Sequence, residues 1–297
     1  MKSVAEAVLV RGGAVHLSRY LRRDRTVVLA YHNIVPHGEP VSGDRSLHLP
    51  VGKFSAQLDA LLRYCEVIPL DSVFERNVCK RPRVVITFDD AYRGTVTAGV
   101  AELVQRGLPA TIFVIPGCVG ASSFWWDAVL PVAEQERQGF RQWALEELGG
   151  SDSEIKAWAR AEGVTPLELP AHASAATEEE LRRASEHPGI TFGSHTWSHP
   201  NLTALDAGSV ERELSSSLQW LRQRFGSVVP WLTYPYGLTA PVVERTAAAV
   251  GYHGAFRAIG GWLPKTNTGA FALPRLNVPA GVTPNGFTLR LAGMMDR

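Results

Sequence analysis

Short apolar runs alternate with helix-like segments along most of this 297-residue chain. Between the runs, apolar residues recur at the three- and four-residue spacing of amphipathic helices, most clearly over residues 210–225 and 242–250. Repeated strand–helix units predict a parallel sheet, because a crossover returns the chain to the same end of the next strand. This pattern fits an open doubly wound sheet as well as a (β/α) barrel. The runs typical of strands are 26–32, 66–70, 84–88, 110–115, 190–194, 231–234, 254–256 and 271–273.

The stretch from Gly117 to about Pro188 interrupts this alternation. It contains the segment Phe124-Trp125-Trp126-Asp127, two charged amphipathic segments and a Pro/Ala-rich piece over residues 166–176. We interpret residues 118–188 as a helical insertion on the active-site face rather than as a second domain. The prediction is therefore one catalytic domain over residues 1–297.

Composition excludes several functional classes. The chain is 45% hydrophobic and 20% charged, as globular proteins are, and its net charge of +1 gives no reason to expect a nucleic-acid surface. It has no apolar stretch long enough to span a membrane, and residues 1–25 lack the apolar core of a signal peptide, so a cytoplasmic protein is expected. Cys65, Cys79 and Cys118 are widely spaced and are predicted to be free buried thiols. Residues 1–25 are predicted to form an amphipathic helix with Val4, Val8, Val15, Leu17 and Leu21 on its buried side.

Two of the predicted strands end in residues suited to bind a metal ion. One run leads into Asp89 and Asp90, and another leads into His195, with His199 four residues later. The carboxyl ends of parallel strands meet on one face, where (β/α) enzymes place their active sites. One carboxylate and two imidazoles make a divalent-metal site with open positions, and the second carboxylate can act as a general base. This set of groups is suited to metal-assisted hydrolysis.

Each segment also has an ordinary structural interpretation. Adjacent aspartates can cap a helix or begin a turn, and a single strand-end histidine is more often structural than a ligand. The combination favours the metal site, because histidines one helical turn apart lie about 5–6 Å apart at Cβ, a span that one ion can bridge. A third segment, Tyr234-Pro235-Tyr236-Gly237, is either a plain turn or a turn that directs a backbone N–H at an oxyanion.

With these three segments, the chain resembles the polysaccharide deacetylase family, the NodB-homology domain of carbohydrate esterase family four. The family's Thr-Phe-Asp-Asp, His-Ser/Thr-x-x-His and Arg-x-Pro-Tyr/Phe-Gly motifs correspond to Thr87–Asp90, His195–His199 and Thr233–Gly237. The resemblance covers roughly residues 26–279 and implies a distorted (β/α) barrel. It also implies metal-dependent removal of an acyl group from an amide nitrogen, usually the N-acetyl group of a sugar.

The resemblance also assigns roles, residue by residue. It implies Asp89 as the base, and the backbone N–H of Tyr236 beside the metal at the oxyanion. It implies that one divalent ion is held by Asp90, His195 and His199. We expect zinc, with cobalt or nickel able to substitute.

The chain departs from the family in the groups around the base. Thr233 stands where the family has arginine, so the usual cation beside the base is missing, and Arg275 is predicted to supply one from another strand. The acidic residues that usually precede the family's pocket tryptophan are absent before Trp262. We predict Trp126, Trp262 and Arg275 as substrate-binding residues, while an anchor for the insertion is the alternative role of Trp126.

The general acid is the least determined assignment. The family's late Leu-x-His motif has no match after Gly254, and His32, at the end of the first strand, is predicted to replace its histidine. Some family members with a permuted motif order resemble this arrangement, and His253 is the competing candidate. The other histidines have no motif context and are predicted to lie at the surface: His16, His37, His48, His172 and His187.

Three functions remain open from the sequence. The first is a metal-dependent amide hydrolase that removes an N-acyl group, predicted to be acetyl, from an amino sugar or glycoconjugate. The second is a non-catalytic carbohydrate-binding relative, favoured by the altered motifs but opposed by the retained base and metal ligands. The third is a deacylase of a small non-sugar amide in a biosynthetic pathway. The oligomeric state is not indicated.

Overall fold

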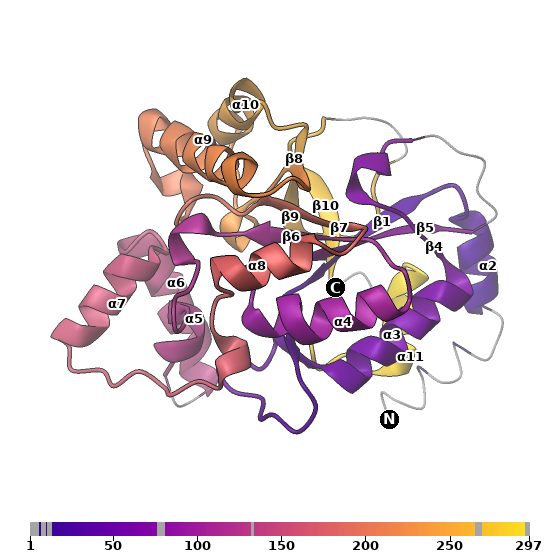
Figure 1. Cartoon of the computed structure of the whole chain (residues 1–297), viewed down its shortest axis with the longest axis horizontal. Helices are drawn as coiled ribbons and strands as arrows, with labels where there is room; N and C mark the ends of the chain where they lie inside the picture. Colours follow the sequence, from indigo (N-terminus) through magenta and orange to yellow (C-terminus); the bar gives the residue numbers. More distant parts are fainter. Residues whose placement is uncertain are drawn as a thin grey trace.

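The computed structural model describes residues 6, 10, 14–75, 81–131, 134–264 and 269–294. Seven parallel strands form a closed barrel in the order β1-β10-β9-β8-β7-β6-β5, and β4 pairs with the first two residues of β5 (Figure 1). A separate pair, β2 and β3, lies outside the barrel. The strands are β1 (Thr26–Tyr31), β2 (Asn33–Val35), β3 (His48–Pro50), β4 (Glu66–Val67), β5 (Arg83–Phe88), β6 (Ala110–Val114), β7 (Ile190–Ser194), β8 (Val228–Thr233), β9 (Gly254–Gly260) and β10 (Leu273–Asn277).

Closure depends on β1, which pairs with β10 on one side and with β5 on the other. The β1–β5 ladder runs in register from Thr26 with Arg83 to Tyr31 with Phe88, and every residue of both strands is buried. Strands buried on both faces read as continuous apolar runs, which explains why these two were identifiable from the sequence. The barrel implied by the family resemblance is confirmed. The last strand was predicted over residues 271–273 but lies at Leu273–Asn277.

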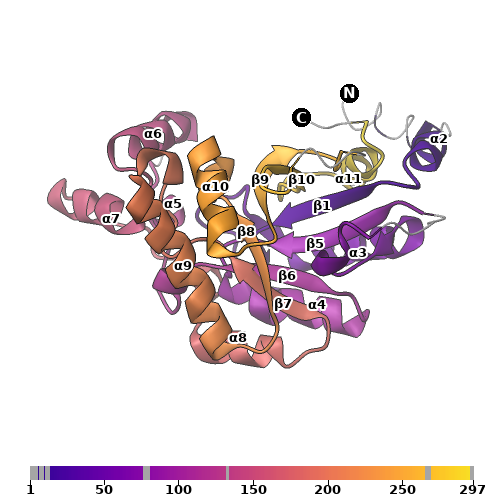
Figure 2. The ribbon, with the colours of Figure 1, turned by 90° about the horizontal axis from the view of Figure 1, so that it is seen from above.

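Helices cover the outside of the barrel, and two helices near the chain ends, which pack together, are drawn above β1 in Figure 2. Apolar side chains from alternating positions of the strands fill the interior, including Val28, Val85, Phe113, Trp231 and Phe256. The helices are α2 (Ala14–Leu21), α3 (Val51–Tyr64), α4 (Val100–Gln105), α5 (Trp125–Ala128), α6 (Glu134–Glu147), α7 (Asp152–Ala161), α8 (Glu178–Ser185), α9 (Ala207–Arg224), α10 (Pro241–Val250) and α11 (Pro284–Leu291). Short turns of other helix types are η1 (Leu70–Ser72), η2 (Thr95–Gly99), η3 (Pro116–Cys118), η4 (Ala171–Ala173), η5 (Leu202–Ala204) and η6 (Pro235–Gly237).

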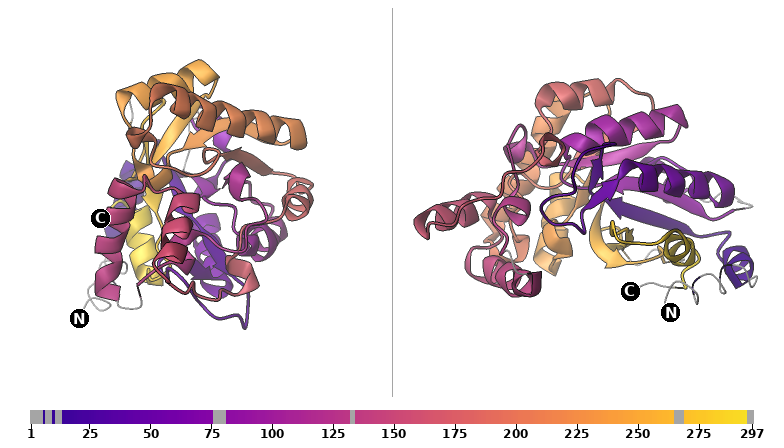
Figure 3. Two further views of the ribbon diagram at one scale, coloured as in Figure 1. Left: turned by 90° about the vertical axis from the view of Figure 1, so that its left-hand side faces the viewer. Right: turned by 90° about the horizontal axis from the view of Figure 1, so that it is seen from below.

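The segment between β6 and β7 places α5, α6 and α7 beside the carboxyl ends of the strands (Figures 2 and 3). These helices share a small core of their own, in which Phe124, Trp125 and Trp126 pack with Ile155 and Tyr92. The fourth helix of this segment, α8, instead contacts β7 and η2 on the flank of the barrel. The segment therefore adds a wall beside the strand ends, where the predicted catalytic residues lie.

The N-terminal prediction can be compared only in part, because Val4, Val8 and the side chain of Leu17 lie outside what the structure describes. Cys79 also lies outside the described residues. In α2, Val15 is buried against Leu289 and Ala292, but Leu21 is 63% exposed, so its predicted place on the buried side is wrong. Cys65 and Cys118 are both buried, as predicted, and Cys118 is a free thiol. In the part of the chain that the structure describes, no helix combines the length and apolar character needed to cross a bilayer.

Candidate metal centre and active site

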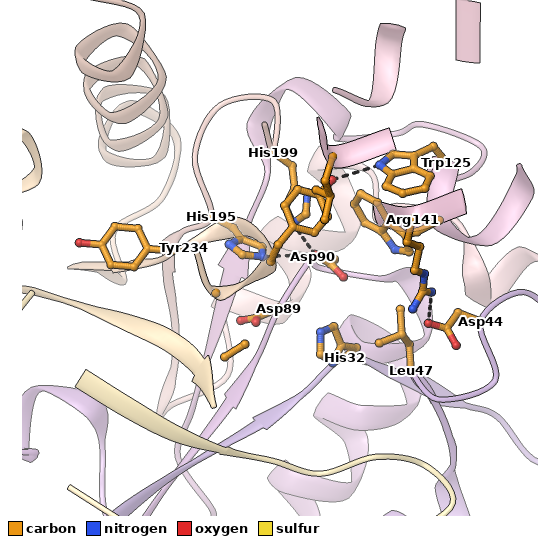
Figure 4. A pocket seen from close by; sticks show the side chains of 15 residues that line it. His32, Asp44, Leu47, Asp89, Asp90, Trp125, Arg141, His195, His199 and Tyr234 are labelled. Carbon is orange, nitrogen blue, oxygen red and sulfur yellow. Dashed lines mark hydrogen bonds and ion pairs between the residues drawn. The ribbon is translucent and has the colours of Figure 1, made fainter. Parts of the chain in front are cut away.

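A pocket opens at the carboxyl ends of the barrel strands and collects most of the predicted site residues (Figure 4). His32 follows β1, Asp89 and Asp90 follow β5, His195 follows β7, and Tyr236 follows β8. The pocket holds about 170 Å³. Its lining consists of His32, Asp44, Leu47, Asp89, Asp90, Trp125, Trp126, Arg141, Leu145, His195, His199, Tyr234, Tyr236, Gly237 and Ala258.

Backbone strain is concentrated at this pocket. Among the described residues, the non-glycine residues with positive φ are Asp90, Ala91, Thr196, His199 and Tyr236. All five lie within or beside the three motif segments, at φ values of 51–69°. A side-chain-bearing residue in this region costs about 1–3 kcal/mol, which the surrounding structure must offset, and such residues cluster at functional sites. The strain allows the chain to turn sharply at the strand ends and bring both carboxylates and both imidazoles together.

Asp90, His195 and His199 form the cluster that could hold a metal ion. One ligand atom from each lies within 4.8 Å of the others, and all three residues are buried. Asp90 Oδ1 is 3.4 Å from His195 Nε2 and 3.8 Å from His199 Nε2. These separations are long for hydrogen bonds, but ligands about 2.0–2.1 Å from a tetrahedral ion lie about 3.3 Å apart. The spacing therefore fits a divalent ion shared by the three residues.

The orientation of His195 supports the same interpretation. Its Nδ1 lies 2.8 Å from the carbonyl oxygen of Thr233, and because a carbonyl only accepts, Nδ1 carries the proton. Nε2 then presents its lone pair to the Asp90 carboxylate, an arrangement that needs a cation between them. Burial lowers the pKa of His195, but Asp89 and Asp90 raise it above its ordinary value, so a proton competes with the metal.

The imidazole of His199 packs against aromatic rings, while its backbone N–H donates to the Thr196 hydroxyl. The centres of the Trp126 and Tyr236 rings lie 4.6 and 4.7 Å from the centre of its imidazole. Its Nδ1 is buried without a hydrogen-bond partner among the described residues, and buried polar atoms of this kind are typical of residues that bind a ligand or an ordered water. Burial and the neighbouring His195 hold the pKa of His199 well below its ordinary value, which keeps the imidazole neutral for metal binding.

The turn that carries the two histidines is fixed by a residue that the sequence did not single out. Glu213 of α9 accepts hydrogen bonds from the backbone N–H groups of Trp197 and Ser198, both at 2.9 Å, and from the Ser198 hydroxyl. A glutamate on a helix without a motif has no distinguishing sequence signal. Its contact with the turn depends on how α9 packs against the barrel, which no local sequence pattern indicates.

Asp89 makes a bidentate ion pair with Arg275 of β10. The two guanidinium nitrogens donate to the two carboxylate oxygens at 2.8 and 2.6 Å, and Arg275 is fully buried. Burial raises the pKa of Asp89, but Arg275 and the nearby His195 lower it well below its ordinary value. The cation predicted to come from another strand therefore lies beside Asp89. It is not among the residues that line the pocket, so the structure gives no support to its predicted contact with a substrate.

Replacing Arg275 with methionine should destabilise the fold and shift the acid limb of activity. Breaking a buried ion pair from one side costs about 3–5 kcal/mol, because the other charge remains buried and unpaired. Folding lowers the pKa of Asp89, so the wild-type pair stabilises above the ordinary carboxyl pKa of about 4 and loses this contribution as pH falls further. Without Arg275, burial should raise that pKa and move the acid limb of kcat to higher pH. Urea unfolding and a pH–rate profile measure both effects, and an unchanged acid limb would contradict the assignment of Asp89 as the base.

The two candidates for the general acid lie at opposite ends of the barrel. His32 is half-buried, lines the pocket and follows the carboxyl end of β1. His253 is exposed and directly precedes β9, at the amino end of that strand. The structure therefore brings only the first of these two histidines to the pocket.

Tyr236 and Trp126 lie against the metal cluster. The Tyr236 hydroxyl donates to the carbonyl of Gly150 at 2.7 Å, which ties η6 to the insertion, and no described residue accepts from its backbone N–H. Trp126 is stacked on Phe124, and its indole N–H donates to the Tyr92 hydroxyl at 2.8 Å. It packs in the core of the insertion and also lines the pocket, and its contact with a substrate stays a prediction.

Three predicted positions differ from the structure. Trp262 is not in the pocket, because the chain reverses after Gly260, and Trp262 pairs antiparallel with Val27 in the main core. His48 and His172 are buried rather than at the surface, at 0% and 5% exposure. Pocket residues without any sequence motif were missed: Asp44, Leu47, Arg141, Leu145 and Ala258.

Comparison with known proteins supports the resemblance that the sequence motifs indicated. A family model described as polysaccharide deacetylase matches residues 76–255, more than half of the chain. The chain is 22% identical over 272 residues to YxkH of Bacillus subtilis (strain 168), a protein assigned to the polysaccharide deacetylases, with 90% of this chain and 76% of that protein covered.

Solved structures share the fold. The Streptococcus pyogenes deacetylase PplD in complex with acetate superposes with a TM-score of 0.63 at 18% identity, over 92% of this chain and 99% of that one. IcaB from Ammonifex degensii superposes with a TM-score of 0.63 at 17% identity, over 91% and 97% of the two chains. With the family match over residues 76–255, the barrel and the ordered motifs, this chain belongs to the polysaccharide deacetylase family.

Proposed function

We propose that this protein is a metal-dependent N-deacetylase that acts on an N-acetylated amino sugar or glycoconjugate. The observation that carries the proposal is the cluster of Asp90, His195 and His199 with Asp89 beside it in one pocket. A protein that only binds carbohydrate has no need for a low-pKa carboxylate next to three metal-competent ligands. Family membership supports deacetylation as the reaction class.

Each residue has a distinct task in the proposed reaction. A divalent ion held by Asp90, His195 and His199 would polarise the acyl carbonyl and acidify a water molecule. Asp89 stays ionised at working pH because of Arg275, and it accepts the proton of the attacking water. The backbone N–H of Tyr236 donates to the developing oxyanion. Arg275 orients the Asp89 carboxylate and is itself held by the carbonyl of Arg257 at 2.9 Å.

His32 is proposed to protonate the departing amine, because an amide anion is a very poor leaving group. Replacing His32 with alanine should leave metal and fold intact and lower kcat on N-acetyl sugars by about 10²–10⁴-fold. The loss should be much smaller on 4-nitrophenyl acetate, whose phenolate departs without a proton. Equal losses on amide and ester would contradict the role, and His253→Ala is the matched control that should keep wild-type rates.

Acetate release from a panel of substrates tests the proposed function. The metal-loaded protein is incubated with N-acetylglucosamine, its β-1,4-linked oligomers and a sugar-free acetamide, and free amine and acetate are quantified. Release from at least one saccharide is expected. Saccharide binding without release would favour a non-catalytic carbohydrate-binding protein, and release from the sugar-free acetamide alone would favour a small-amide deacylase.

A further inference from the structure

An ion pair crosses one side of the pocket, away from the metal cluster. Asp44 lies in the loop between β2 and β3, and Arg141 lies on α6 of the insertion, almost a hundred positions later in the chain. Both side chains line the pocket, and Figure 4 shows them beside His32 and Leu47, on the opposite side from Tyr234. No step in the proposed deacetylation uses either residue.

The Asp44 carboxylate is fixed in place by its own loop. Its Oδ1 accepts from the backbone N–H and the hydroxyl of Ser46, at 3.0 and 2.8 Å. Its backbone N–H donates to Asp127 Oδ1 at 2.8 Å. Gly43 precedes it at φ 78°, where a Cβ would clash with the Asp127 carboxylate, so this loop position requires glycine. The loop is thereby held rigidly against the insertion.

Asp127 is in turn held by a fully buried network. His48 Nε2 lies 2.9 Å from Asp127 Oδ1, and the Tyr92 hydroxyl donates to Oδ2 at 2.6 Å. Asn33 Nδ2 lies 2.8 Å from His48 Nδ1, and because an amide NH₂ only donates, His48 is neutral with its proton on Nε2. Every hydrogen-bonding group of His48 and Asp127 is thus assigned to this network. It supports Asp44 on one side and, through Tyr92, Trp126 on the other.

The pair retains capacity to bind a ligand. Burial raises the pKa of Asp44, but Arg141 and Ser46 lower it below its ordinary value, so the carboxylate stays charged. A guanidinium carries several N–H donors in a planar fork, and in the described chain only Nη2 has an acceptor, Asp44 Oδ2. The Arg141 side chain is 37% exposed. Unused donors and a carboxylate oxygen thus face the same pocket as the Trp125 and Trp126 rings.

We propose that Asp44 and Arg141 form a specificity-determining clamp that binds the hydroxyl groups of a neutral amino sugar while its N-acetyl group reaches the metal cluster. A carboxylate beside a guanidinium offers both an acceptor and donors, which matches neighbouring sugar hydroxyls, and the paired charges favour an uncharged ligand over an anionic one. Adjacent aromatic rings provide an apolar face for the sugar ring. This inference rests on the proposed deacetylase function and names its substrate class.

Two substrates separate a clamp on the sugar from a general effect on the site. Chitotriose triacetate carries the sugar hydroxyls, and 4-nitrophenyl acetate carries none. Asp44→Asn keeps a side-chain oxygen that can accept hydrogen bonds from Ser46, and Arg141→Gln removes the guanidinium group. Each should lower kcat/KM on the trisaccharide by about tenfold to a hundredfold, mainly through KM, because a hydrogen bond to a charged group is lost. Both should retain ester hydrolysis within about twofold, and Arg141→Lys should recover part of the loss.

The matched control is Arg106→Gln. It breaks an ion pair of Arg106 with Asp59 that joins two barrel helices and does not line the pocket, and it should leave both substrates unaffected. Unchanged trisaccharide kinetics in both clamp variants, or equal losses on sugar and ester, would overturn the proposed clamp but not the proposed deacetylase function. A loss in Arg141→Gln confined to N-acetylglucosamine 1-phosphate would overturn the choice of a neutral ligand. No acetate release from any saccharide by the wild type would overturn the proposed function and the clamp together.

Discussion

Replacing Asp89 with asparagine should lower kcat by about 10²–10⁴-fold while the protein still binds one divalent ion per chain. Asparagine keeps the shape of the side chain but cannot accept the proton of the attacking water. Because Asp89 is not one of the three clustered ligands, metal content should not change. Steady-state acetate release and elemental analysis of the same preparation measure the two effects. Loss of the metal from Asp89→Asn would mean that the roles of Asp89 and Asp90 are reversed.

This variant leaves Arg275 buried without its anionic partner, so stability must be separated from catalysis. A buried unpaired charge destabilises by about 3–5 kcal/mol. The double variant Asp89→Asn/Arg275→Met removes both charges and should recover much of the lost free energy of unfolding while remaining inactive. Recovery of activity in the double variant would contradict the role of Asp89 as the base.

The combined replacement of Asp90, His195 and His199 by alanine should abolish both metal binding and deacetylation. Wild-type protein purified without chelators should contain about one divalent ion per chain, with zinc preferred for this ligand set. Because the pKa of His195 is raised, protons compete with the metal ion for this side chain. The affinity of the wild-type protein for the metal should therefore fall as pH decreases. His253→Ala removes a histidine outside the pocket and serves as the control. Undiminished metal in the triple variant would place the ion elsewhere.

Much of the barrel was predictable because its strands are buried on both faces. Continuous apolar runs such as Val84–Phe88 have no competing interpretation when helices with clear periodicity flank them. Barrel closure, in contrast, could not be predicted from local sequence patterns. It depends on β1 pairing with β10 as well as with β5, a long-range event without a local signal, and only the family resemblance distinguished the barrel from an open sheet.

The central cluster was predictable because its members are close to strand ends in sequence. Asp90, His195 and His199 meet once the strands are parallel, since their positions follow directly from where β5 and β7 end. The positive φ values of Asp90 and His199 could not be predicted, because residues with side chains adopt that conformation only rarely. The structure thus adds the strain that lets these side chains converge.

Residues outside the strand ends were harder to place. Trp262 was expected in the pocket from the family resemblance, but the reversal at Gly260 places it in the main core beside Val27. Asp44 and Arg141 had no motif, and their meeting depends on how the insertion folds over the strand ends. Surface-like histidines such as His48 became buried for the same reason. Tertiary contacts, rather than local sequence patterns, decided each of these positions.

Acetate release by metal-free protein, titrated with zinc, tests the central claim most directly. Chelator-treated protein is incubated with the saccharide that the panel identifies as its best substrate, and zinc is added in steps up to a small excess over the chain. We predict that metal-free protein releases no acetate, and that activity rises linearly to a plateau at one equivalent of zinc. Full activity without metal, or none at any zinc concentration, would contradict a deacetylase centred on Asp90, His195 and His199.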